Sequence, residues 1–256
     1  MTSPLLRRAS AAVIPLALLL AACGDDAGTS ATTTAPWTSA PAASSAFCDA
    51  AGDFVTALGS DGDPSTALQA AIAAAPDGVA GHLTTFGERM GAAAQSGDDA
   101  AFLAADVRSS ANTAQQDIAK ACGYHAADVT GVEYSFDGLG DELPAGPTAF
   151  HLTNKGKQAH EMLVYRRAAG TTGDLVDILN DDPTASDGRL DEVGVMLPAG
   201  PGEESTLLQD LTPGDYVVVC FIPDGTTSVD QIAAGKGDRS GPDHRSKGMI
   251  HAFTVK

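Results

Sequence analysis

Four side chains in the second half of this 256-residue chain belong to types that bind soft metal ions. They are His160, Cys220, His244 and Met249. One thiolate, two imidazoles and a thioether form the donor set of copper sites that transfer electrons, in which the thioether is a weak axial ligand. The sequence therefore predicts that these four residues converge on a single copper ion.

Each of these residues also has a purely structural interpretation. Cys220 ends the apolar run "YVVVC", where a thiol is often a small core residue or the partner in an intermolecular disulfide. Met249 could fill the core, and His251 would replace His244 as a ligand if His244 faced solvent. The choice depends on the elements that position these side chains.

In the segments around these residues, the apolar side chains recur with the two-residue period of β-strands. Seven of them are separated by Gly, Pro, Asp and Asn: 129–139, 148–156, 160–167, 192–200, 204–211, 214–222 and 250–256. Residues 173–182, "GDLVDILNDD", interrupt them with the pattern of a short helix. Seven short strands over about 125 residues predict a sandwich of two sheets.

Three segments carry a resemblance to a known family. In "TNKGKQAHEM" a turn and His160 open a strand, and in "LTPGDYVVVCFIPD" a strand with a tyrosine ends at Cys220. The segment "HRSKGMIHAFTV" places His244 and Met249 in the spacing His-x4-Met. In this order they resemble the cupredoxins, in particular the plastocyanin-like domains of exported bacterial and archaeal proteins.

This resemblance implies a Greek-key β-sandwich over residues 129–256 and a blue type 1 copper site. His160, Cys220 and His244 would be the three strong ligands, and Met249 would be the axial one. They would bind one copper ion that alternates between Cu(I) and Cu(II).

The chain departs from the cupredoxin pattern between Cys220 and His244. In the family these residues lie a few positions apart, whereas here 23 residues separate them. The Pro-Asp pairs at 223–224 and 242–243 have the composition of two stems. We expect them to close an excursion that returns His244 to its usual place.

The chain begins with a targeting signal. Residues 1–22 combine two arginines with the apolar run "AAVIPLALLLAA", which is too short for a permanent membrane helix. The tetrapeptide "LAAC" resembles a bacterial lipobox, which implies cleavage before Cys23 and lipidation of that residue; otherwise the segment is an ordinary secretory signal. Residues 23–46 are rich in Thr, Ser, Ala and Pro and predict a disordered tether. We therefore expect an exported lipoprotein anchored at the outer face of the cell membrane.

Residues 47–125 predict a small helical domain in which apolar residues recur at helical spacing. Its four helical segments begin near Phe47, Asp63, Val79 and Asp98. An exported protein lies in an oxidising compartment and Cys23 is assigned to lipid, so Cys48 and Cys122 are expected to form a disulfide across the ends of this domain. The predicted fold class is α+β and multidomain, with a disulfide-stapled helical bundle followed by a cupredoxin-like sandwich.

The net charge excludes two classes of direct partner. Acidic residues outnumber basic ones 33 to 15, and the charge of −18 becomes −20 once Arg7 and Arg8 leave with the signal. Nucleic acids and anionic membrane surfaces require clustered Lys and Arg, so we expect neither to bind. We expect a monomer that contacts the membrane through its lipid and meets a basic redox-partner protein.

The sequence lacks the motifs of several enzyme classes. Multicopper oxidases bind a trinuclear cluster with His-x-His pairs, and this chain contains none. It also lacks Gly-x-Ser-x-Gly and His-Glu-x-x-His. We therefore expect one-electron transfer through the copper site and no enzymatic activity. Two alternatives stay open: a copper chaperone or storage protein, and a metal-free cupredoxin-like binding or structural module.

Overall fold

The computed structural model describes residues 43–59, 63–181, 187–235 and 241–256. The predicted signal, Cys23 and all but the last four residues of the predicted tether lie outside these ranges. None of the helices within them combines the length and the apolar character that a membrane span requires.

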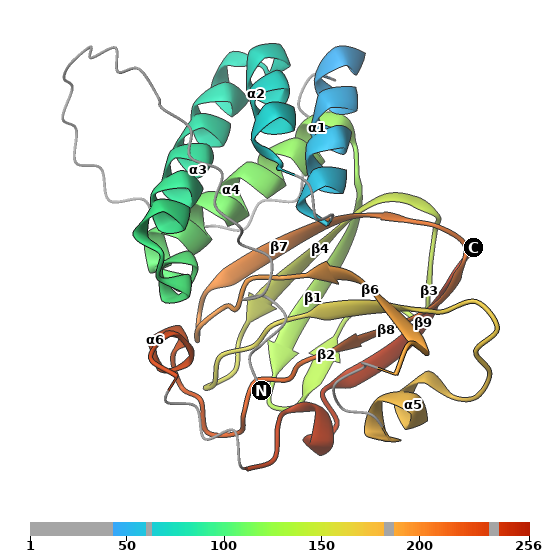
Figure 1. Ribbon diagram of the computed structural model, residues 1–256. Coiled ribbons are helices and arrows are strands. Elements are labelled where there is room, and N and C mark those ends of the chain that lie inside the picture. The colour runs from blue at the N-terminus through green and yellow to red at the C-terminus, as the bar shows by residue number, and fades with distance from the viewer. Residues whose placement is uncertain (1–42, 60–62, 182–186, 236–240) are drawn as a thin grey trace.

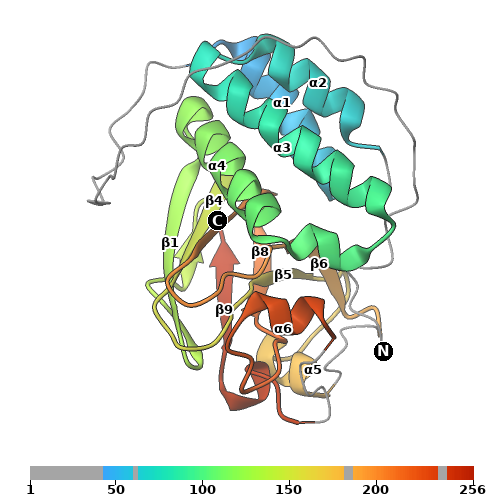
Figure 2. The ribbon, with the colours of Figure 1, turned by 90° about the vertical axis from the view of Figure 1, so that its left-hand side faces the viewer.

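Four helices form a layer on one side of the molecule (Figures 1 and 2). Their bounds are α1 Ser45–Leu58, α2 Ser65–Ala74, α3 Asp77–Ser96 and α4 Ala105–Cys122. All four predicted helical segments are therefore present, although the fourth begins later in the chain than the sequence predicts.

The predicted start of the fourth helix at Asp98 is wrong, because Asp98 caps a different element. Its carboxylate accepts a hydrogen bond of 3.0 Å from the N–H of Ala100 and begins the 3-10 helix η2, Asp99–Leu103. Ala104 has φ −59° and ψ 141°, which are not helical values, so the chain turns there before α4 begins. Gly123 then ends α4 in the left-handed conformation that glycine favours at this position.

The strands form the predicted two-sheet sandwich. One sheet has the strand order β2-β1-β4-β7 and the other the order β3-β9-β8-β5-β6. The strands are β1 His125–Val132, β2 Ser135–Asp137, β3 Glu142–Leu143, β4 Gly146–Asn154, β5 Leu163–Arg167, β6 Leu190–Val195, β7 Glu204–Leu211, β8 Gly214–Val219 and β9 Ile250–Val255. Since β1 pairs with β4 and β3 with β9 in parallel, both sheets are mixed and the chain crosses repeatedly between them.

The strand predictions differ from the structure mainly at the start of the sandwich. The predicted strand at 129–139 is two strands, because β1 turns back into β2 and pairs with it in antiparallel register. The predicted short helix at 173–182 is confirmed as α5, Leu175–Asp181. Two further short elements, α6 Val229–Ala233 and the 3-10 helix η3 Arg245–Lys247, lie between β8 and β9.

Alternation along β4 divides its side chains between two cores. Phe150 faces the interior of the sandwich, where it packs with Val218 and Phe253 of the other sheet. Its neighbour Ala149 faces the opposite way and joins a cluster with Phe47 of α1. The helical layer therefore covers the outer face of the sheet that contains β4 and β7. On the other side, α5 packs against the outer face of β8.

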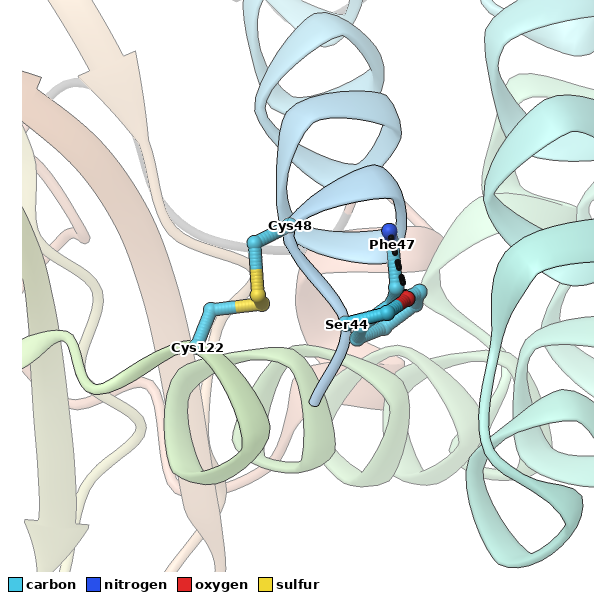
Figure 3. The surroundings of a disulfide bond; sticks show 4 residues. All are labelled: Ser44, Phe47, Cys48 and Cys122. Atoms are coloured by element: carbon cyan, nitrogen blue, oxygen red, sulfur yellow. Dashed lines mark hydrogen bonds between the residues drawn. A yellow bond between two sulfur atoms is a disulfide. The ribbon is translucent and has the colours of Figure 1, made fainter. Parts of the chain in front are cut away.

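The predicted disulfide between Cys48 and Cys122 is confirmed (Figure 3). It joins the first turn of α1 to the last residue of α4 and links positions 74 residues apart. Beside it, the side chain of Ser44 caps α1 by accepting a hydrogen bond of 3.2 Å from the N–H of Phe47. The disulfide thus joins the start of the first helix of the layer to the end of the last one.

Removal of this bridge should destabilise the protein strongly. The double variant Cys48→Ser/Cys122→Ser should lose roughly 4–5 kcal/mol in the free energy of unfolding, since the bridge closes a long loop in the unfolded chain. Urea unfolding followed by far-UV circular dichroism measures the loss, and the wild type under reducing conditions should match the variant. An unchanged unfolding midpoint in both samples would contradict a stabilising role for the bridge.

Arg108 of α4 ties the helical layer to the segment between β6 and β7. Its guanidinium donates to the carbonyl of Leu103 over 2.9 Å, to that of Pro198 over 3.2 Å and to the carboxylate of Glu203. Glu203 also accepts a hydrogen bond of 2.7 Å from the N–H of Gly200. The hydrogen bond from Arg108 lowers the pKa of Glu203 below its usual value of 4.5, although partial burial opposes the shift.

The Glu203→Gln variant should be less stable than the wild type at neutral pH and equal to it in acid. Because the pKa of Glu203 is lowered in the folded state, its carboxylate contributes stability above the unfolded-state pKa. This contribution disappears as the pH falls through the folded-state pKa. Urea midpoints at neutral and acidic pH test this, with Glu142→Gln in the exposed Glu142–Lys256 pair as the control. A stability difference independent of pH would argue against the ion pair.

Candidate metal centre

Cys220 lies one residue beyond the end of β8, and backbone hydrogen bonds hold it on both sides. Its N–H donates to the carbonyl of Met249 over 3.1 Å, and its carbonyl accepts from the N–H of Arg245 over 2.9 Å. The residue is fully buried and outside any disulfide of the described chain. Burial raises the pKa of its thiol well above the usual value, and the charge of Glu161 adds to the shift. Without a cation nearby, the thiol keeps its proton.

His160 is held by backbone pairing with Ala199. The N–H of His160 donates to the carbonyl of Ala199 over 3.0 Å, and the reverse hydrogen bond measures 2.8 Å. This pair is an isolated antiparallel bridge that lies just before β5 begins at Leu163. The imidazole of His160 is fully buried.

His244 returns to the site from the 23-residue insertion, whose two ends are paired. The N–H of Asp224 donates to the carbonyl of Pro242 over 2.9 Å, and the residues that flank them form an isolated antiparallel bridge. The N–H of His244 then donates to the carbonyl of Ile222 over 2.9 Å. The predicted stems of the excursion are therefore confirmed, and they place His244 next to the strand end that carries Cys220.

The donor atoms of three predicted ligands converge in this buried space. The Nδ1 atoms of His160 and His244 are 3.2 Å apart, and the Sγ atom of Cys220 lies 3.4 Å from Nδ1 of His244. All three donor atoms lie within 4.8 Å of one another. Nitrogen and sulfur ligands of a tetrahedrally bonded metal, at about 2.0–2.3 Å from it, are about 3.3–3.6 Å apart. The group is therefore suited to hold one metal ion.

A backbone hydrogen bond to His244 holds Met249 beside this group. It is fully buried, and its N–H donates to the carbonyl of His244 over 2.9 Å. The role of its thioether as an axial ligand stays a prediction. His251 is not needed as a substitute for His244, because His244 is buried within the group and Nε2 of His251 instead lies 3.5 Å from a carboxylate oxygen of Asp141.

Both imidazoles of the group are neutral near pH 7. Burial, together with the neighbouring His244, lowers the pKa of His160 to about 4, and burial also lowers the pKa of His244. A neutral imidazole can offer a nitrogen lone pair to a metal, whereas a thiol must first release its proton. A cation that enters this site would therefore displace one proton, from Cys220.

Glu133 and Gly156 shape the surroundings of His160, and sequence reasoning missed both. One carboxylate oxygen of Glu133 accepts hydrogen bonds from the N–H groups of Lys157 and Gln158 and lies 3.8 Å from Nε2 of His160. That nitrogen has no hydrogen-bond partner among the described residues. Ligand imidazoles usually direct their second nitrogen at a carboxylate or a carbonyl, and Glu133 is placed for that role. A Cβ atom at position 156 would lie 2.5 Å from the same carboxylate oxygen and 2.8 Å from Nε2 of His160.

The Gly156→Ala variant should therefore displace Glu133 or His160 and weaken metal binding. We expect its affinity for Cu(I), measured by competition with a chromogenic chelator, to fall by about 10–100-fold, as is typical when the surroundings of a ligand are disturbed. Gly91→Ala in α3 is the matched control, because a Cβ atom there meets nothing within 4 Å. Equal affinities of the two variants would show that the close approach at Gly156 does not matter for binding.

Several solved structures of copper proteins resemble part of the chain. No family model and no curated protein matches the chain. Among solved structures, an auracyanin from Roseiflexus castenholzii is 19% identical, with a TM-score of 0.33, over 51% of this chain and 96% of its own. Auracyanin A, a blue copper protein from Chloroflexus aurantiacus, is 17% identical, with a TM-score of 0.31, over 51% and 98%. Rusticyanin from Thiobacillus ferrooxidans is 15% identical, with a TM-score of 0.27, over 51% and 77%.

These neighbours are cupredoxins, and they match the C-terminal half of the chain. A multicopper oxidase from Aquifex aeolicus also matches, at 13% identity and a TM-score of 0.29, over 52% of this chain and 30% of its own. The chemistry of the site is inferred from its own side chains.

Proposed function

We propose that the protein is an exported, lipid-anchored copper protein that carries one electron at a time. His160, Cys220 and His244 would hold one copper ion, with Met249 as the weak axial ligand. The observation that carries this proposal is the convergence of two imidazoles and a thiol, whose ligand atoms lie within 4.8 Å of one another in a fully buried space.

Bound copper would supply a one-electron exchange between Cu(I) and Cu(II). The residues of the chain contribute fixed positions, because β8, β9 and the paired stems hold the ligands through backbone hydrogen bonds. Their complete burial keeps water away from the donor atoms. A thiolate and two imidazoles suit both oxidation states, so ligands held in place have little to rearrange when an electron moves.

Burial favours a carrier over the two alternatives. A chaperone passes its ion to a partner by ligand exchange, which requires a ligand that the partner can reach, and His160, Cys220 and His244 are all 0% exposed. In a metal-free module, no bound ion would offset the free-energy cost of burying two facing imidazole nitrogens and a thiol.

The remaining parts of the proposal rest on the sequence. The predicted lipid at Cys23 and the tether would hold the folded part near the outer face of the cell membrane. The net charge of −18, which becomes −20 without Arg7 and Arg8, would attract a basic redox partner, and this association would weaken as the salt concentration rises. The lack of His-x-His pairs favours an electron carrier over an oxidase.

A copper titration of residues 24–256, followed by visible absorption, tests the proposal. We expect an intense thiolate-to-copper charge-transfer band that saturates at one equivalent of copper. The band should be absent from Cys220→Ser, which removes the thiolate, and from His244→Ala, which removes a ligand that contacts it.

His151→Ala is the matched control for the titration. His151 lies on β4, and its Nδ1 atom is 3.1 Å from the hydroxyl of Thr206, so the variant should keep both the band and the stoichiometry. If the wild type shows no band and retains copper in neither oxidation state, the proposed function is wrong.

A further inference from the structure

The outer nitrogen of His244 also has a specific partner. While Nδ1 of His244 faces His160 and Cys220, Nε2 lies 3.2 Å from Oε1 of Gln158. His244 is 0% exposed, so this nitrogen has no contact with bulk water. The ring is therefore enclosed between the metal-binding group on one side and the Gln158 amide on the other.

The neighbours of Gln158 determine which way its amide points. Its Nε2 atom is 3.2 Å from a carboxylate oxygen of Asp224, which can only accept a hydrogen bond while it is ionised. Its Oε1 atom accepts a hydrogen bond from the N–H of Gly225, which can only donate. A reversed amide would lose both interactions, so the oxygen is the atom that faces His244.

Asp224 is in turn held by two other side chains. The hydroxyl of Tyr134 and the ammonium of Lys247 both donate to its carboxylate. Tyr134 follows β1, Lys247 lies in η3, and Asp224 lies in the first stem of the insertion. Together with Gln158, these residues form a polar cluster that joins four separate segments. We call this the Gln158 cluster.

We propose that Gln158 is a positioning residue that keeps His244 protonated at Nε2, so that the lone pair of Nδ1 faces the metal-binding group. An amide oxygen carries no hydrogen, and the hydrogen bond to it therefore requires a proton on Nε2 of the ring. A neutral imidazole has only one ring proton, which leaves Nδ1 free. In the other tautomer, two acceptors would face each other at 3.2 Å in a buried position.

The effect of Gln158 on copper binding rests on the proposed function, but its effect on the tautomer of His244 does not. A ring protonated at Nδ1 must move that proton before it can bind a metal through Nδ1. Gln158 therefore prepares the site in the metal-free protein. Asp224 and Gly225 support this role, because their hydrogen bonds to the Gln158 amide fix its orientation.

Nitrogen NMR of the metal-free protein tests the proposal without copper. In long-range ¹H–¹⁵N spectra, the signals of His244 are assigned as those that are missing from the spectrum of His244→Ala. We expect these signals to show that wild-type His244 is protonated at Nε2. In Gln158→Leu, we expect a mixture of tautomers and an affinity for Cu(I) that falls by about 10–100-fold. Gln231→Leu is the matched control: Gln231 lies in the insertion that also carries Asp224, and its Oε1 atom accepts a loop hydrogen bond of 2.7 Å from the N–H of Thr227.

The outcomes separate this inference from the proposed function. Protonation of wild-type His244 at Nδ1, or a Gln158→Leu variant with the tautomer and affinity of Gln231→Leu, would overturn the role of Gln158. If no form of the protein binds copper, the proposed function fails while the tautomers of the wild type and of Gln158→Leu still decide the inference. Should Gln158→Leu not fold, the wild-type tautomer decides it alone.

Discussion

The backbone hydrogen bonds that continue the β8–β9 pairing past the end of β8 are the constraint on which the site depends. The N–H of Cys220 bonds to the carbonyl of Met249, and the carbonyl of Cys220 bonds to the N–H of Arg245. These bonds keep the thiol beside the turn that carries His244, whatever the course of the intervening chain. The core of the sandwich, in which Cys220 and Met249 are both buried, prevents the pairing from slipping.

The 23-residue insertion therefore does not loosen the site. The N–H of Asp224 donates a hydrogen bond to the carbonyl of Pro242, and the N–H of His244 donates one to the carbonyl of Ile222, so the base of the insertion is closed. The Gln158 cluster uses the first stem and η3 as two of its four segments. Asp224 and Gly225 of the insertion also hold the Gln158 amide that contacts the outer nitrogen of His244. Ligands that are buried and held in place by strand pairing favour the proposed electron transfer over the delivery of metal to a partner.

The sequence predicted those features that depend on residue type and local spacing. The donor set, the two-sheet sandwich and the helix at 173–182 follow from short-range patterns, whereas the disulfide follows from the oxidising compartment and the assignment of Cys23 to lipid. The structure contains the sandwich, the helix and the disulfide. The capping role of Asp98 was misjudged because a cap residue can begin a 3-10 helix as well as an α-helix. Glu133 and Gln158 could not be found, since their roles arise from contacts across segments that the sequence does not pair.

A pair of crystal structures, with and without copper, tests most directly whether the backbone assembles the site before the metal binds. We expect copper bonded to Nδ1 of His160, Nδ1 of His244 and Sγ of Cys220, with these residues in the same positions in the metal-free crystal. Copper bound elsewhere, or a metal-free structure in which His244 has left the group, would contradict the claim that the backbone assembles the site before the metal arrives.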